Sequence, residues 1–193
     1  MHKPPTRKEL THERIVATAA RALRAGGFEG VGVADIMRQA GLTHGGFYAH
    51  FPSRDVLLCE ALERAGRDSA ARVASRDHAL DSGASPFRML VENYLSERHL
   101  GAPESGCPVA ALASEMPRQN QAVARVAATR VRSLIAAVGE RLHPGISSAT
   151  AGVIAGQLVG ALQLARALGD EAEGKAVLAA TRRALLEQYD LKS

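Results

Sequence analysis

Apolar positions recur every three or four residues along most of the chain, which is the spacing of one face of an α-helix. No segment keeps the period-two alternation of a strand, so the sequence predicts an all-α protein of about nine helices. We expect these helices at residues 9–25 (or 12–25), 33–40, 43–50, 54–76, 87–98, 108–115, 118–142, 147–168 and 171–188.

Polar caps, glycines and prolines delimit these segments. Thr6 together with Glu9, or alternatively Thr11, is placed to cap the first helix. Thr43 is placed to cap the short third helix, and Pro52 ends it. The boundaries therefore follow from the same chemistry that satisfies unpaired amides at helix starts.

Aromatic side chains and positive charge are both concentrated at the N-terminal end. Four of the seven aromatic residues lie within the first 51 positions, and residues 1–55 carry eight Lys or Arg against five Asp or Glu. A basic segment on a nearly neutral body suits a polyanionic partner bound at one end, although a merely solvated basic face would have the same charge.

Composition excludes several other classes of protein. The 36 alanines, absence of Trp and two cysteines exclude collagen, a disordered polar tail and a disulfide scaffold, and argue against a β-sandwich. We expect a three-helix N-terminal domain over residues 1–53 and a larger helical domain over residues 54–193, linked by the helix at 54–76.

Residues 33–51 predict a helix, a tight turn and a second helix, the arrangement by which many regulators read DNA. Gly41 permits the turn without steric cost at Cβ. Leu42, Phe47 and Phe51 are expected on the buried side of this unit. The small and polar residues on its outer surface would then enter a major groove, where base edges are distinguishable.

Residues 11 to about 63 strongly resemble the N-terminal domain of the TetR family of transcriptional repressors. The resemblance rests on T-H-E-R-I, G-G-F-E-G, V-A-D-I-M-R-Q-A-G-L-T, G-G-F-Y-A-H-F and P-S-R-D-V-L-L. It implies an N-terminal helix-turn-helix domain, a C-terminal domain for effector binding and dimerisation, and a palindromic operator. The protein is thus expected to be a homodimeric, ligand-responsive repressor.

The expected DNA contacts come from the second helix of the motif and the start of the next helix. They are Thr43, His44, Gly45, Gly46, Tyr48, Ala49, His50 and Arg54. For some of these residues a structural role stays open. Tyr48 could be a ring at the edge of the core, His50 a packed or capping histidine, and Arg54 a partner of neighbouring acids.

Cys107 follows Gly106 at the start of a predicted helix, where a thiol can have a lowered pKa and raised nucleophilicity. Some members of the family carry a comparable Gly-Cys pair and respond to electrophiles, so the resemblance makes Cys107 a candidate sensor. The alternative is a small buried residue, which is also the expectation for Cys59. The other effector-site candidates are Phe87, Tyr94, His99, Met116, Gln163 and Arg166, for an apolar or mildly polar effector of modest size.

Gly152, Gly156 and Gly160 recur every four residues and therefore form one stripe of a predicted helix. Each interior glycine costs about 1 kcal/mol relative to alanine, which the close approach of another helix would offset. In the family the last two long helices form the dimer interface, so we expect dimerisation through residues 147–168 and 171–188. Close packing within one subunit is the alternative.

Other function classes find less support in the sequence. A helical-bundle enzyme would need paired carboxylates or a Glu-x-x-His arrangement, and a helical adaptor would have no DNA role. We expect no cofactor and no metal site; the expected partners are operator DNA, a second copy of the chain and a small molecule. The N-terminus lacks the apolar segment of a signal peptide, which favours a cytoplasmic protein.

Overall fold

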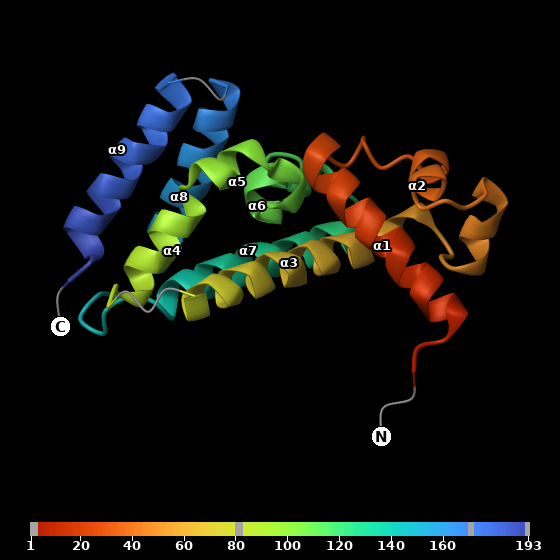
Figure 1. Cartoon of the computed structure of the whole chain (residues 1–193), viewed down its shortest axis with the longest axis horizontal. Helices are drawn as coiled ribbons and strands as arrows, with labels where there is room; N and C mark the ends of the chain where they lie inside the picture. Colours follow the sequence, from red (N-terminus) through yellow and green to blue (C-terminus); the bar gives the residue numbers. More distant parts are fainter. Residues whose placement is uncertain (1–3, 80–82, 170–171, 192–193) are drawn as a thin grey trace.

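The computed structural model describes residues 4–79, 83–169 and 172–191, and every regular element within these ranges is helical (Figure 1). The elements are α1 (Arg7–Gly26), α2 (Val33–Gln39), the 3-10 helix η1 (His44–Ala49), α3 (Arg54–Ala79), α4 (Pro86–Tyr94), α5 (Glu97–Gly101), η2 (Pro103–Ser105), α6 (Pro108–Leu112), η3 (Met116–Arg118), α7 (Gln121–Gly139), α8 (Thr150–Ala167) and α9 (Ala172–Tyr189). The all-α prediction is confirmed for this described part of the chain.

A reciprocal cap starts helix α1. The Thr6 hydroxyl accepts a hydrogen bond from the Glu9 amide at 3.2 Å, and the Glu9 carboxylate accepts one from the Thr6 amide at 2.6 Å. The hydrogen bonds that the Thr6 amide and the Thr6 hydroxyl donate to the Glu9 carboxylate lower the pKa of Glu9. Thr11 does not serve as the cap but donates to the Arg7 carbonyl inside the helix, so the first of the two predicted caps is the one used.

The third predicted helix is a 3-10 helix rather than an α-helix. Gly45 and Gly46 lie in its first turn, and each interior glycine disfavours an α-helix by about 1 kcal/mol relative to alanine. Short helical segments commonly take the tighter 3-10 geometry. The sequence predicted the position of this helix correctly, but not that it is a 3-10 helix.

The prediction of one helix over residues 87–98 is wrong, because the chain forms α4 and α5 there. Helix α4 ends at Tyr94, and Ser96 starts α5 by accepting a hydrogen bond from the His99 amide at 3.3 Å. A serine in the middle of an apolar pattern competes for backbone hydrogen bonds and so begins a new helix.

Two other predicted helices are shorter in the structure. Segment 108–115 is helical only as α6, and segment 118–142 is helical as α7, which Asn120 caps by accepting from the Val123 amide at 3.1 Å. The predicted start of the last helix, Glu171, lies outside the described residues. Its remainder is α9.

Helix α3 organises the tertiary structure. It is the longest helix that the structure describes, with 26 residues, and it lies alongside α7 for much of its length (Figure 1). Helix α1 packs on its first half, while α8 and α9 pair at the opposite end of the molecule. The buried side chains form one continuous cluster from Ile15 to Leu185, so both parts share a core.

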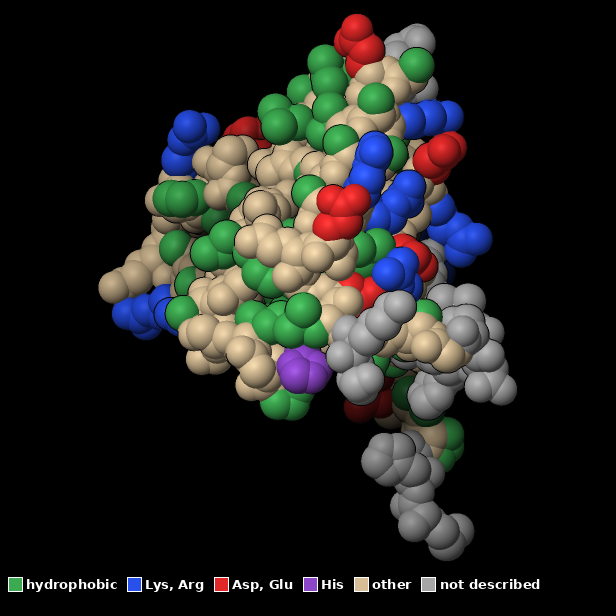
Figure 2. All heavy atoms as spheres, turned by 90° about the vertical axis from the view of Figure 1, so that its left-hand side faces the viewer, with side chains coloured by type: hydrophobic (Ala, Val, Ile, Leu, Met, Phe, Trp, Pro, Cys, Tyr) green, Lys and Arg blue, Asp and Glu red, His purple; other side chains and the backbone are tan. Residues whose placement is uncertain are grey.

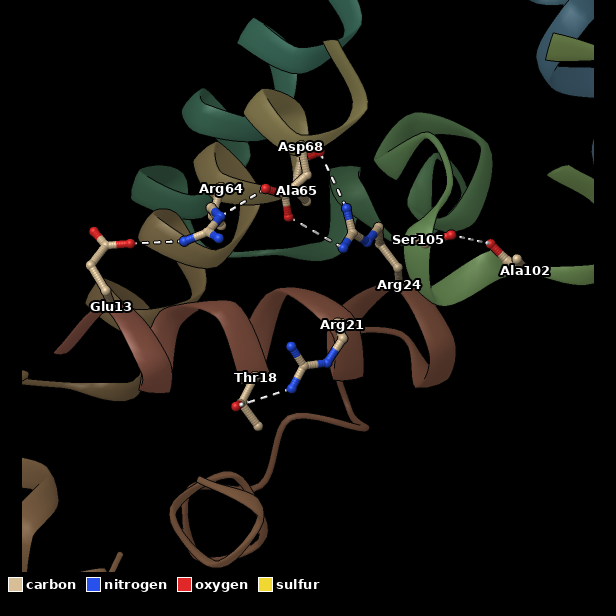
Figure 3. Close-up of polar contacts among 9 residues, drawn as sticks. All are labelled: Glu13, Thr18, Arg21, Arg24, Arg64, Ala65, Asp68, Ala102 and Ser105. Atoms are coloured by element: carbon tan, nitrogen blue, oxygen red, sulfur yellow. Dashed lines mark hydrogen bonds and ion pairs between the residues drawn. The ribbon is translucent and has the colours of Figure 1, made fainter. Parts of the chain in front are cut away.

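A buried cation joins α1 to α3 (Figure 3). Arg24 is only 4% exposed; its guanidinium donates to the Ala65 carbonyl at 3.3 Å and lies 3.6 Å from the Asp68 carboxylate. Asp68 also accepts from Arg64 at 2.7 Å, and Arg64 reaches Glu13 of α1 at 2.8 Å. Burial lowers the pKa of Arg24, an effect that Asp68 opposes.

A second link runs from the C-terminal part to the loop after α1. The Glu115 carboxylate accepts a hydrogen bond from the Phe28 amide at 2.9 Å. Gly27 has a φ of +72°, and a Cβ there would lie 2.6 Å from the Glu115 Oε1 atom. This loop therefore accommodates the carboxylate only with glycine at position 27.

We expect Asp68→Ala to lower the free energy of unfolding by about 2 kcal/mol, because Arg24 would stay buried without its carboxylate partner. Urea denaturation measures the effect. Glu63→Ala, which removes an exposed acid from the same helix, is the matched control and should change stability by less than about 0.5 kcal/mol. Equal stability of the two variants would show that the Arg24 contact is not stabilising.

Candidate functional site

Helix α2, a turn at Gly41 and η1 form a compact helix-turn-helix unit. Gly41 has a φ of +68°, and the amides of Gly41 and Leu42 bond to the carbonyls of Arg38 and Met37, both at 2.9 Å. These bonds satisfy carbonyls at the end of α2 and reverse the chain. The predicted role of Gly41 as the turn residue is thus supported by its backbone conformation.

Aromatic side chains hold η1 against the core. Phe47 and Phe51 are 1% and 0% exposed, and their rings stack at 5.5 Å between centroids. Phe28, in the loop between α1 and α2, is also fully buried. Since these rings take the inner side of η1, the opposite side is left for solvent, where Tyr48 is 73% exposed.

The outer surface of η1 carries most of the candidate DNA contacts. Thr43, His44, Gly45 and Ala49 are exposed, and Gly46 is half-buried against Met37. Thr43 occupies the N-cap position, but its side chain makes no capping bond; the Gly46 amide bonds to the Thr43 carbonyl instead, at 3.1 Å. The Thr43 hydroxyl therefore remains available on the surface.

His50 points away from this surface. Its half-buried ring lies 6.0 Å from the ring of His12 and 6.3 Å from that of Phe51, and its buried Nδ1 has no hydrogen-bond partner. Burial, followed by His12 and Lys8, lowers the pKa of His50. A neutral, packed imidazole suits the structural role better than a contact to phosphate.

Arg54 is engaged in holding the N-terminal loop. Its Nε donates to the Val31 carbonyl at 3.0 Å, and its Nη2 donates to the Phe28 carbonyl. The guanidinium thus ties the start of α3 to the loop between α1 and α2. Because these bonds occupy the guanidinium, we leave Arg54 out of the proposed DNA contacts.

Four of the effector-site candidates do come together. The ring of His99 lies 4.9 Å from that of Tyr94, its Nδ1 lies 2.7 Å from the Tyr94 carbonyl, and its Nε2 lies 3.0 Å from the Cys107 amide. Because a carbonyl only accepts, Nδ1 carries the proton and Nε2 accepts from Cys107. Arg166 donates to the His99 carbonyl at 2.7 Å and completes the group.

Packing against His99 explains why a glycine precedes Cys107. A Cβ at position 106 would lie 2.6 Å from the Nε2 atom of His99, so only glycine lets the imidazole reach the next amide. Cys107 is the N-cap of α6 and is 7% exposed. The other cysteine, Cys59, is half-buried, and burial and nearby acids raise its pKa, in keeping with a structural thiol.

The remaining three candidates lie elsewhere. Phe87 is buried against the ring of Tyr189, with 6.4 Å between centroids, and lines a separate hollow with it. Met116 is buried in η3, and Gln163 is half-buried on α8. None of these three side chains borders the two cavities beside Tyr94.

Two adjoining cavities meet at Tyr94 and Cys107, with volumes of about 70 and 380 Å³. The larger one is bordered by several residues that sequence reasoning missed, among them Gly66, Arg67, Arg130 and Leu134. Their shared wall arises only when α3 and α7 pack side by side, so no local pattern could have identified them.

The glycine stripe of α8 faces outward. A Cβ at Gly152, Gly156 or Gly160 would have no atom of the described chain within 4 Å, so the alternative of close packing within one subunit is wrong. Val153 and Leu164 of the same helix are 58% and 61% exposed. Viewed from the α9 side, apolar side chains are interspersed with other atoms over the left and upper part of the surface, while most charged side chains lie in a band toward the right (Figure 2).

Among the described residues, no cluster of His, Cys, Asp and Glu has the composition of a metal site. No described helix combines the length and the apolar character needed to cross a membrane.

Known proteins resemble the chain in sequence and fold. The profile of the family "Bacterial regulatory proteins, tetR family" matches residues 15–61. An uncharacterized HTH-type transcriptional regulator of Mycobacterium tuberculosis, Rv0196, is 30% identical over 169 residues, which cover 82% of this chain and 85% of that protein.

Solved structures extend the likeness to the whole fold. A TetR-family transcriptional regulator from Agrobacterium tumefaciens is 25% identical with a TM-score of 0.74, covering 94% of this chain and 98% of its own. A regulator of the same family from Cytophaga hutchinsonii is 17% identical with a TM-score of 0.77, covering 99% and 100%.

Proposed function

Because the chain belongs to the TetR family of DNA-binding transcriptional regulators, which are not enzymes, we propose that it is a homodimeric repressor released from a palindromic operator by a small-molecule effector. The observation that carries this proposal is the outer face of η1, where Tyr48 is 73% exposed while the phenylalanines behind it are buried. The protein would act in the cytoplasm, where the DNA is.

The proposed DNA contacts are those that remain on this face: Thr43, His44, Gly45, Gly46, Tyr48 and Ala49. The Thr43 and Tyr48 hydroxyls suit phosphate oxygens, which fix the register of the protein on the duplex. The glycines and Ala49 keep the surface narrow enough for close approach to the groove. Binding should weaken steeply as salt rises, because phosphate contacts release counterions.

The proposed dimer forms through α8 and α9. Open space above three glycines, next to exposed Val153 and Leu164, suits a helix of a second copy that packs closely on this face. Two-fold symmetry would place the two η1 surfaces on half-sites about one helical turn, or a multiple of it, apart.

The proposed release acts through α3 and the links to α1. An effector in the cavities beside Tyr94 would contact the middle and second half of α3, and the middle of α3 holds α1 through Ala65 and Asp68. The Glu115 contact to the Phe28 amide provides a second connection. For release, the effector has to bind more tightly to the conformation that does not bind DNA than to the conformation that does.

Modification of Cys107 is the second proposed route of release. The thiol borders both cavities and lies beside the Tyr94 hydroxyl, so a bulky adduct would displace the cavity wall. An electrophile small enough to enter the 380 Å³ cavity would reach it.

We expect Thr43→Ala and Tyr48→Phe each to lower affinity for operator DNA about 3- to 10-fold, the loss of one phosphate hydrogen bond. Fluorescence anisotropy measures this on a duplex selected from a random pool. Thr129→Ala, an exposed threonine of α7, is the matched control and should bind like the unchanged protein. If the unchanged protein binds selected and random duplexes equally, a non-DNA adaptor becomes the better description.

We expect Gly156→Glu to convert the dimer to a monomer, since the carboxylate would be buried unpaired against the second copy. Sedimentation velocity reports the mass. Gly101→Glu also places the new side chain in open space, but on α5 rather than on the proposed dimer helices, and should leave the dimer intact. A monomeric unchanged protein, or a dimeric Gly156→Glu variant, would rule out this interface.

We expect Cys107→Ser to keep operator affinity within about 3-fold and to abolish release by N-ethylmaleimide, because the attacking thiolate is gone. Anisotropy with and without the reagent measures release, and mass spectrometry locates the adduct. Cys59→Ser is the matched control and should still be released. Release of the Cys107→Ser variant would exclude the thiol route.

A further inference from the structure

The larger cavity has the size and lining of a small-molecule site. Its volume of about 380 Å³ falls within the usual range for ligand pockets. Aliphatic side chains from four helices form much of its wall, including Val73 of α3, Leu90 of α4, Val109 of α6 and Leu134 of α7. An apolar ligand body would be well accommodated there.

The charged side chains at this cavity are mostly cationic. Arg67, Arg130 and Arg141 border it, against the single acid Glu140. Arg141 donates to the Ala137 carbonyl at 3.0 Å and has further interactions. Across the described residues neither Arg67 nor Arg130 forms an ion pair, so the local charge is not neutralised from within the chain.

Arg130 borders the cavity and packs on α3 at Gly66, where no side chain is in the way. A Cβ at Gly66 would lie 2.5 Å from the Arg130 Nη1 atom and 2.8 Å from its Cδ, so the guanidinium packs directly on the glycine backbone. The Nε atom of Arg130 is buried and has no hydrogen-bond partner. A buried donor without a partner is costly, and a bound acceptor would satisfy it.

Tyr94 supplies a second donor without a partner. The residue is 7% exposed, borders both cavities, and its buried hydroxyl makes no hydrogen bond. Burial, and next the Cys107 thiol, raise the pKa of Tyr94 well above its ordinary value. The phenol therefore stays protonated at physiological pH and can donate to a ligand.

We propose that the effector of this protein is an organic carboxylate with an apolar body, its carboxylate bound by Arg130 and Tyr94 and its body by the aliphatic wall. The unpaired donors of Arg130 and Tyr94 favour a ligand whose polar end only accepts hydrogen bonds. A carboxylate has two oxygens that do so. This inference rests on the proposed function for its regulatory consequence, but not for the binding itself.

The volume also gives an approximate size for a test ligand. At about 30 Å³ for each non-hydrogen atom, similar to the share of one water molecule in the liquid, the cavity holds about a dozen such atoms. Decanoate has this size, and decanol and decylamine match its chain with a neutral and a cationic end. The three compounds therefore separate the contribution of charge from that of the apolar body.

Isothermal titration calorimetry of the full chain with each compound tests the proposal. We expect decanoate to bind at least about 10-fold more tightly than decanol, and decylamine to bind most weakly, as a desolvated charge pair requires. Because this comparison uses the unchanged protein, it does not depend on how any variant folds. Equal binding of decanoate and decanol would overturn the proposal, as would no binding of decanoate.

Variants then test the assigned residues. Arg130→Gln should weaken decanoate binding about 10-fold and Tyr94→Phe about 3-fold, with decanol binding nearly unchanged. Arg132→Gln, an exposed arginine on the same helix, is the matched control and should bind decanoate normally. Indistinguishable affinities of the Arg130→Gln and Arg132→Gln variants would reject Arg130 as the anchor.

Operator binding, measured with and without decanoate, keeps the two proposals apart. Release by decanoate in the unchanged protein but not in the Arg130→Gln variant supports an effector role. Decanoate binding that leaves operator affinity unchanged would overturn the effector role and keep only a ligand site. Absence of specific DNA binding would overturn the proposed function, while calorimetry would still decide whether the carboxylate site exists.

Discussion

The packing of α1 against α3 is the constraint on which the rest of this structure depends. The first half of α3 packs against the N-terminal unit, and its middle and second half border the cavity. One helix therefore contacts both regions. Arg24, buried at the end of α1, bonds to Ala65 and Asp68 near the middle of α3. A displacement of the second half of α3 therefore has a direct route to the helix-turn-helix unit.

Polar groups are distributed very differently over the two functional regions. Around the helix-turn-helix unit, Arg54 bonds to two loop carbonyls, and Thr6 and Glu9 cap each other, while the buried Nδ1 atom of His50 has no partner. At the cavity, buried atoms of Arg130 and Tyr94 have no partner. Unpaired buried donors are rare in stable cores, and a ligand in the cavity would satisfy the atoms of Arg130 and Tyr94, which border it.

The exposed apolar surface of α8 also indicates a binding partner. A monomer gains nothing from glycines that leave a helix face open to water, or from Val153 and Leu164 beside them. The same features favour close contact once a second helix covers the face. Dimer formation and DNA reading would thus use opposite ends of the molecule (Figure 1), and α3, which borders the cavity, runs between them.

The sequence by itself determined the all-α class, the position of most helices and the inward side of the helix-turn-helix unit. These features depend on residues close in the chain: helical periodicity, caps such as Thr6, and the spacing of Phe47 and Phe51. Only the tertiary structure decided that Arg54 clamps a loop, that the glycine stripe faces outward and that Arg130 lies over Gly66. Those outcomes depend on which distant segments pack together, and local patterns carry no information about such contacts.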